Sequence, residues 1–140
     1  MMSEISELLF GSQDYAIIAT KITRDVDWNY INFIPLMYKN ENVSVIDDVA
    51  NMSPKGLIFG PYIHLSKGIY DIHVEVSNDV STSIVKITSD KGIKSYKEEK
   101  IKKGDNCIRI VLDNDVHDVE FVVCSNDDYV NVNSIWYEVI

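Results

Sequence analysis

GLIFGPYIHLSKGIYDIHVEV, residues 56–76, contains two apolar runs, and the second run alternates strictly between apolar and polar residues. Successive side chains of a strand point to opposite faces of a sheet, so this alternation predicts a half-buried β-strand. The face that we expect to lie in the core carries Tyr70, Ile72, Val74 and Val76. The face that we expect to meet solvent carries Asp71, His73 and Glu75.

The first of these runs is interrupted in its middle by Gly60-Pro61. Proline removes a donor from the hydrogen-bond ladder and glycine tolerates unusual backbone angles, so the pair predicts a β-bulge or a sheet edge. A bulge changes the face that the following side chains meet, and it would reorient Tyr62 and His64 together. We expect residues 65–68 to return the chain as a β-hairpin, which would place His64 and His73 on one surface.

The remainder of the chain also favours β structure. It contains 19 Ile and 16 Val against 6 Leu and 3 Ala, and β-branched residues fit strands better than helices. Strand-like runs recur from residue 15 onward, among them 28–38, which contains Pro35, and 130–140. In the last of these runs, the two-residue period predicts that Ile135, Tyr137 and Val139 point inward and that Trp136 and Glu138 point outward. Residues 47–55 are predicted to be a polar loop, and Asp/Asn/Gly-rich turns separate the later runs.

Many short strands without a long helix between them predict an all-β fold, an antiparallel β-sandwich of the jelly-roll kind. The only helix that we expect is short and N-terminal, at residues 3–10, with Ser3 as its cap and Gly11 after its end. We therefore expect residues 1–140 to form a single β-sandwich domain, with residues 1–12 as a short helical lead-in.

The formal net charge of −9 disfavours nucleic acid and anionic membrane surfaces as partners. No stretch of about 18 apolar residues is present, so we expect no membrane insertion. The N-terminus MMSEISELLFGSQ lacks the features of a secretory signal, which predicts a cytoplasmic protein with reduced, buried thiols at Cys107 and Cys124.

The pattern of residues 56–74, with Gly60-Pro61-Tyr62, Leu65, Gly68 and Tyr70 at its centre, resembles the central hairpin of jelly-roll modules that accompany bacterial glycosyltransferases and methyltransferases of surface-polysaccharide synthesis. These modules are similar to carbohydrate-binding modules. The resemblance covers residues 50–140 and weakens downstream. Where the family usually has an Arg-bearing Glu-Phe-Arg strand, this chain has Glu120-Phe121-Val122. The resemblance implies glycan binding or an accessory role without catalysis.

Catalytic motifs are scarce in the sequence. The three histidines, His64, His73 and His117, are far apart and lack the spacing of metal ligands, and no nucleophile elbow, phosphate loop or dinucleotide fingerprint occurs. We therefore expect no enzymatic activity. The remaining catalytic alternative is a small enzyme whose active site lies on the concave sheet face that would otherwise bind sugar.

Sugar binding requires an exposed aromatic ring beside polar side chains. The exposed aromatic candidates are Trp28, Tyr30, Tyr38, Tyr62, Trp136 and Tyr129. The predicted ligand-binding set is Trp28, Tyr62, His64, His73, Asp71 and Trp136. Each has a structural alternative: burial in the core for Trp28 and Tyr62, cover by a neighbouring element for Trp136, and a solvated sheet face for His64, His73 and Asp71.

Oxygen-rich loops near the C-terminus have the composition of calcium sites. The predicted metal ligands are Asp113, Asp115 and Asp118, which would hold a structural calcium ion. Aspartate is also a common turn residue, so a turn without metal is the alternative. The functional hypothesis is a carbohydrate-binding or accessory module of bacterial polysaccharide synthesis. A protein–protein interaction or oligomerisation module, through a sheet edge or an apolar patch, is the alternative.

Overall fold

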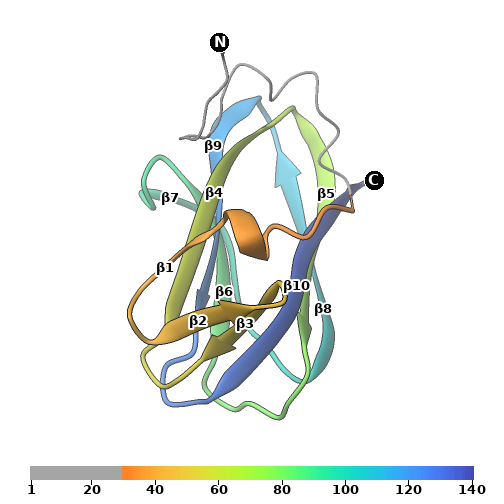
Figure 1. The fold of residues 1–140 in the computed structure, drawn as a ribbon. Helices are drawn as coiled ribbons and strands as arrows, with labels where there is room; N and C mark the ends of the chain where they lie inside the picture. The colour runs from red at the N-terminus through yellow and green to blue at the C-terminus, as the bar shows by residue number, and fades with distance from the viewer. Residues whose placement is uncertain (1–29) are drawn as a thin grey trace.

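The computed structural model describes residues 30–140, which form two antiparallel sheets of five strands each (Figure 1). Sheet A has the order β1 (Tyr38–Lys39), β4 (Leu57–Leu65), β9 (Val116–Cys124), β6 (Ile84–Ser89) and β7 (Lys94–Lys100). Sheet B has the order β2 (Val43–Ile46), β3 (Val49–Met52), β10 (Val130–Val139), β5 (Gly68–Val76) and β8 (Gly104–Leu112). The all-β prediction is confirmed. The expected helix at 3–10 and the lead-in 1–12 lie outside the described residues.

The chain passes repeatedly between the two sheets. Only β2–β3 and β6–β7 are consecutive strands paired within one sheet in the described part of the chain. The segment 65–68 joins β4 of sheet A to β5 of sheet B, so the hairpin predicted there is wrong. Two strands with alternating sequences and a short connection can pair side by side in one sheet or pack face to face in two sheets. The sequence pattern is the same in both cases.

The core lies between the inner faces of the two sheets. Sheet A contributes Val85, Ile87, Val119 and Phe121, and sheet B contributes Ile72, Val74, Ile108 and Ile135, all at most 2% exposed. Burial confirms the inward predictions for Tyr70, Ile72, Val74 and Val76, and also those for Ile135 and Tyr137. Val139 is 54% exposed, so its inward prediction is wrong: β10 ends at this residue, where the sandwich no longer covers it.

The Gly60-Pro61 interruption is a bulge inside a continuous strand. β4 runs through it to Leu65, and its register against β9 shifts between Pro61 and Ile63 and again between Ile63 and Leu65. Tyr62 has a φ of 70°, and its side chain points outward with 39% exposure. The bulge prediction is therefore confirmed, and the alternative of a core position for Tyr62 is wrong.

Residues 28–38 do not form the strand that we predicted, as far as the structure describes them. Asn32, Phe33 and a 3₁₀ helix at Ile34–Leu36 precede β1. Proline has no amide hydrogen for a ladder, and Pro35 lies in that helix. Conversely, residues 47–55 contain β3, which we expected to be loop, because its short segment pairs on both sides with β2 and β10.

The segment before the 3₁₀ helix lies along the edge of β10. Phe33 N–H donates to Ile135 O at 2.8 Å and Tyr30 N–H donates to Tyr137 O at 3.2 Å. The Phe33 ring is fully buried, 5.6 Å from the Phe121 ring. These contacts fix Tyr30 beside β10. Among the described residues, no helix is long and apolar enough to cross a membrane.

Candidate functional site

Three of the predicted ligand-binding residues meet on the outer face of sheet B. Trp136 of β10 is the cross-strand partner of His73 of β5, and Glu138 is the partner of Asp71. On the other side of β5, His73 faces Cys107 and Asp71 faces Arg109 of β8. We define the outer-face cluster as Tyr30, Asp71, His73, Asp105, Arg109, Trp136 and Glu138.

Three rings lie next to one another across this cluster, two of them stacked and the third tilted. The imidazole of His73 lies parallel to the indole of Trp136, with 4.0 Å between centroids and 7° between planes. The Tyr30 ring lies 5.3 Å from the indole at 33°. His73 approaches from the β5 side of β10 and Tyr30 from the opposite side, so the indole is flanked by both rings. Trp136 is half-buried, whereas Tyr30 is 69% exposed and offers the most accessible ring of the three.

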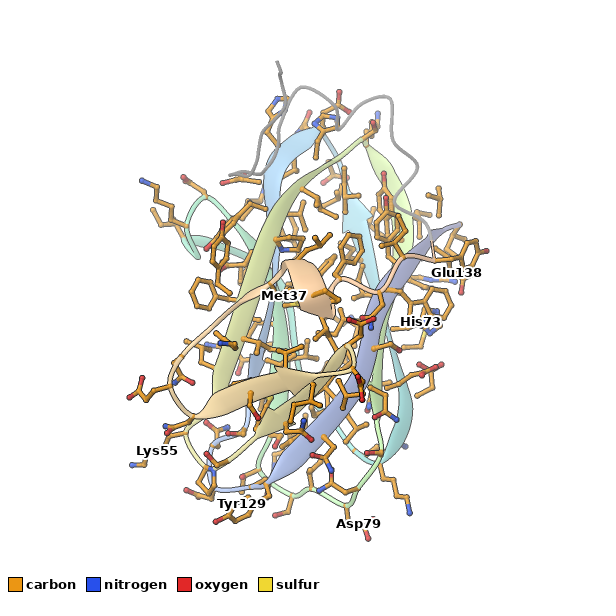
Figure 2. The ribbon with its side chains drawn as sticks, in the orientation of Figure 1. Met37, Lys55, His73, Asp79, Tyr129 and Glu138 are labelled. Atoms are coloured by element: carbon orange, nitrogen blue, oxygen red, sulfur yellow. The ribbon has the colours of Figure 1, made fainter. Side chains whose placement is uncertain are left out.

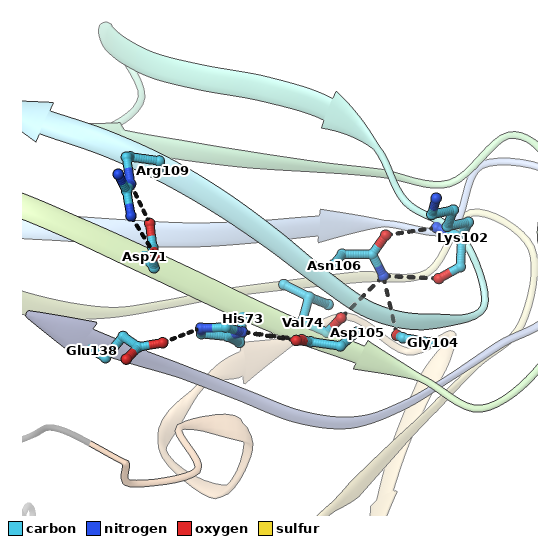
Figure 3. Close-up of polar contacts among 9 residues, drawn as sticks. All are labelled: Asp71, His73, Val74, Lys102, Gly104, Asp105, Asn106, Arg109 and Glu138. Carbon is cyan, nitrogen blue, oxygen red and sulfur yellow. Dashed lines mark hydrogen bonds and ion pairs between the residues drawn. The ribbon is translucent and has the colours of Figure 1, made fainter. Parts of the chain in front are cut away.

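His73 is clamped between two carboxylates, as Figure 3 shows. Its Nδ1 lies 3.0 Å from an Asp105 oxygen, and its Nε2 lies 2.8 Å from Oε2 of Glu138. Burial alone lowers the pKa of His73, but the hydrogen bonds with Glu138 and Asp105 outweigh it and raise the pKa above its usual value. Only the imidazolium can donate from both ring nitrogens, so this geometry favours the charged form.

This burial corrects the prediction of a solvated sheet face. His73 and Asp71 are each only 8% exposed, because the polar side chains of the outer face cover one another. Arg109 donates from Nε and from a terminal nitrogen to the two oxygens of Asp71, at 2.8 and 3.0 Å. This bidentate hydrogen bond holds the pKa of Asp71 below its usual value. The Arg109 side chain stays 57% exposed, so part of its guanidinium can still contact a ligand.

Cys107 lies beside this ion pair. Both cysteines are unpaired, and Cys107 is exposed, so the predicted burial of its thiol is wrong. Partial burial and the nearby Asp71 and Asp105 carboxylates raise the pKa of the Cys107 thiol, which favours the neutral form. The thiol is therefore an uncharged neighbour of the cluster.

The other predicted residues lie elsewhere. Tyr62 is on sheet A, where its hydroxyl donates to the buried Glu120 at 2.8 Å. Burial, together with this hydrogen bond, raises the pKa of Tyr62 to about 12. His64 is also on sheet A, so the prediction that it shares a surface with His73 is wrong. Trp28 lies outside the described residues.

The three predicted calcium ligands are not brought together. Asp115 accepts the Lys67 N–H at 2.8 Å, and Asp118 accepts the Asp90 N–H at 2.9 Å. Throughout residues 30–140, no group of three or more His, Cys, Asp or Glu side chains is arranged to hold a metal ion. Both aspartates thus accept backbone N–H groups of segments distant in the sequence, Asp115 from the connection between β8 and β9 and Asp118 from within β9.

The predicted ligand-binding set lacked four members of the outer-face cluster. Tyr30 was an exposed aromatic candidate and Glu138 was expected to point outward, whereas sequence reasoning missed Asp105 and Arg109 altogether. Both alternate with Ile108 and Ile110 of β8, so their outward direction follows from the period of the strand. Their place beside β5 depends on sheet pairing, for which the sequence holds no local signal.

A cavity lies at another part of the sandwich, away from the outer-face cluster. It is an open cavity of about 600 Å³, lined by Asn40, Lys55, Gly56, Leu57, Thr82, Cys124, Asn126 and Asp127. None of these lining residues is aromatic, so the cavity offers polar contacts without a stacking platform. The outer-face cluster provides both, and it is the stronger candidate.

Comparison with known proteins supports the fold class. No protein-family model matches the chain, and no curated protein is similar to it in sequence. The C-terminal CBM6 of the laminarinase LamC from Zobellia galactanivorans is 16% identical, with a TM-score of 0.56 over 76% of this chain and 95% of that one. The mannan-binding module of Man5C is 16% identical, with a TM-score of 0.58 over 81% and 99%.

A third structure is the carbohydrate-binding module CBM6cm-2 of Cellvibrio mixtus lichenase 5A in complex with cellotriose. It is 12% identical, with a TM-score of 0.53 over 75% of this chain and 92% of that one. The chain therefore has a β-sandwich fold similar to that of these three structures. Fold similarity alone does not determine function, which must be argued from the site.

Proposed function

We propose that this chain is a non-catalytic carbohydrate-binding module that contacts sugar through the outer-face cluster of sheet B. The observation that carries the proposal is the exposed Tyr30 ring, which lies against Trp136 of the Trp136–His73 stack and near an exposed guanidinium and two carboxylates. The similar solved structures are described as binding cellotriose and mannan, which supports the proposal at the level of ligand class.

Each part of the cluster has a role in this proposal. The apolar face of a sugar ring stacks on Tyr30, whose backbone is fixed to β10. Arg109 donates to hydroxyl or carbonyl oxygens, and Asp105 and Glu138 accept from hydroxyl groups with the lone pairs that His73 leaves unused. The excess of carboxylates and the net charge of −9 favour neutral or amino sugars over anionic ones.

The biological setting belongs to the same proposal. The resemblance of residues 56–74 supports an accessory module of bacterial surface-polysaccharide synthesis, and the proposal includes a cytoplasmic location. The repeated passage of the chain between two sheets supports the jelly-roll topology that they share. No catalytic arrangement is part of the proposal.

The test is a glycan array of neutral, amino and anionic polysaccharides, followed by calorimetric titration with the best ligand. We expect Tyr30→Ala and Arg109→Gln to lose binding. Tyr129→Ala is the matched control, because Tyr129 is 72% exposed and lies away from His73 (Figure 2). Wild-type binding in both cluster variants, or loss in the control alone, would show that the sugar site is elsewhere.

One observation favours the alternative of an interaction module. Ile69 and Val111 are cross-strand partners at one end of the outer face, 38% and 58% exposed, and Ile140 is bonded to Ile69 through its backbone. Their side chains form an exposed apolar patch beside the edge strand β8. Gel filtration at two protein concentrations distinguishes the two functions. A dimer that Val111→Asp dissociates would support the interaction module.

A further inference from the structure

A pair of histidines meets on sheet A, on strands that are distant in the sequence. His64 is near the end of β4 and His117 is near the start of β9, and these strands are hydrogen-bonded neighbours. The Nδ1 atoms of the two rings are 3.0 Å apart, with the ring centroids 4.8 Å apart and 36° between the planes. The register shifts after the Gly60-Pro61 bulge bring His64 opposite His117.

The 3.0 Å contact means that one Nδ1 carries a hydrogen and the other presents a lone pair. If that hydrogen moves to Nε2 of its own ring, both rings stay neutral and both Nδ1 lone pairs are available to a metal ion. With metal–nitrogen bonds of about 2.0–2.1 Å, this separation gives an angle at the metal of about 95°. That angle is near the 90° between neighbouring ligands in square-planar or octahedral coordination, and it is smaller than the tetrahedral angle that Zn²⁺ prefers.

The surroundings of the pair favour a cation. His117 is exposed and His64 is half-buried, so an ion can reach the Nδ1 atoms from solvent. Asp115 and Asp118 flank His117 in the sequence, and Asp115 accepts the backbone N–H of Lys67, three residues after His64. These carboxylates raise the local concentration of cations. They are not ligands of the site, because no third side chain in residues 30–140 completes a metal-binding group.

We propose that His64 and His117 form a chelating site for one divalent transition-metal ion, Cu²⁺ or Ni²⁺ in preference to Zn²⁺. Imidazole nitrogen suits these metals, and the remaining coordination positions are taken by water. The site is on sheet A, whereas the outer-face cluster is on sheet B. Metal binding and sugar binding are therefore separate properties, and the loss of one does not imply the loss of the other.

The experiment is calorimetric titration of the full chain with Ni²⁺ in a weakly coordinating buffer. We expect one ion per chain, and we expect His117→Ala to weaken binding at least about tenfold, because the second imidazole acts as an intramolecular ligand. His64→Ala should do the same. Ni²⁺ should also raise the melting temperature of the wild type but not that of His117→Ala, whose exposed side chain can be removed without a cavity.

The matched control is His73→Gln, which removes the remaining histidine of the chain. It should bind Ni²⁺ as the wild type does. The proposal is overturned if the wild type does not bind at millimolar Ni²⁺, if all four proteins bind equally, or if only His73→Gln loses the ion. Equal binding would place the ion at the thiols or the acidic loops, and a loss in His73→Gln alone would place it in the outer-face cluster.

Discussion

His73→Gln is the substitution whose effect can be worked out furthest from the structure. The folded protein raises the pKa of His73 above its unfolded value, because Glu138 and Asp105 outweigh the effect of burial. The folded state therefore binds a proton more tightly than the unfolded state. The resulting stabilisation is fully present below the unfolded pKa of about 6.5 and is lost as the pH rises through the folded pKa. Glutamine retains hydrogen-bonding groups but does not titrate.

The loss of folding stability in His73→Gln has one part that depends on pH and one part that does not. The Asp105 and Glu138 side chains are 49% and 32% exposed, so solvent screening limits the two ion pairs to about 1–2 kcal/mol together. Loss of the parallel stack on Trp136 costs a further ~0.5–1.5 kcal/mol at every pH. For a domain of this size, 1 kcal/mol corresponds to a change in melting temperature of roughly 3–5 °C.

The assay is thermal unfolding followed by circular dichroism between about pH 5.5 and about pH 8.5, a range that spans the usual histidine pKa. The difference in melting temperature between wild type and His73→Gln should be largest at the acidic end and should shrink as the pH rises. His117→Gln should retain the pH trend of the wild type, since it leaves the carboxylate clamp intact. A difference that is constant or that grows with pH would refute the argument.

Three further results are expected. Tyr30→Ala should weaken glycan binding about thirtyfold by titration calorimetry, because a sugar face that buries roughly 80 Å² of apolar area contributes ~2 kcal/mol, while Tyr129→Ala should bind normally. Asp128→Asn should cost about 2–4 kcal/mol in urea unfolding, because Oδ2 of Asp128 accepts the N–H groups of Ser81, Thr82 and Ser83 and the Ser83 hydroxyl at 2.7–3.0 Å. Burial alone raises the pKa of Asp128, but these donors outweigh it and hold the pKa far below its usual value. The difference in unfolding free energy between wild type and variant should therefore become smaller below about pH 4. A difference that does not change with pH would contradict this role of Asp128. Gly56→Ala should destabilise the folded protein by about 1–3 kcal/mol in the same assay, because the added Cβ would lie 2.9 Å from the backbone oxygen of Ser53. Unchanged stability would mean that the backbone of this turn moves to accommodate the methyl group.

Much of the fold follows from the two-residue period of the sequence. The alternation in β5 and β10 places Ile72 and Ile135 in the core, and burial confirms both of them. The two-residue period does not predict the structure correctly where the local pattern is weak. β3 has only four residues and is a strand because β2 and β10 pair with it on both sides, whereas residues 30–36 are apolar but lie along β10 as a turn and a 3₁₀ helix around Pro35.

The sequence by itself determined which side chains point inward and which point outward, because the geometry of a single strand imposes that alternation. Only the tertiary structure decided which outward side chains become neighbours. Asp71, His73 and Trp136 meet because β5 pairs with β10, and His64 meets His117 rather than His73 because residues 65–68 cross from one sheet to the other. Strand pairing depends on the packing of the whole sandwich, and no local pattern of residues encodes it.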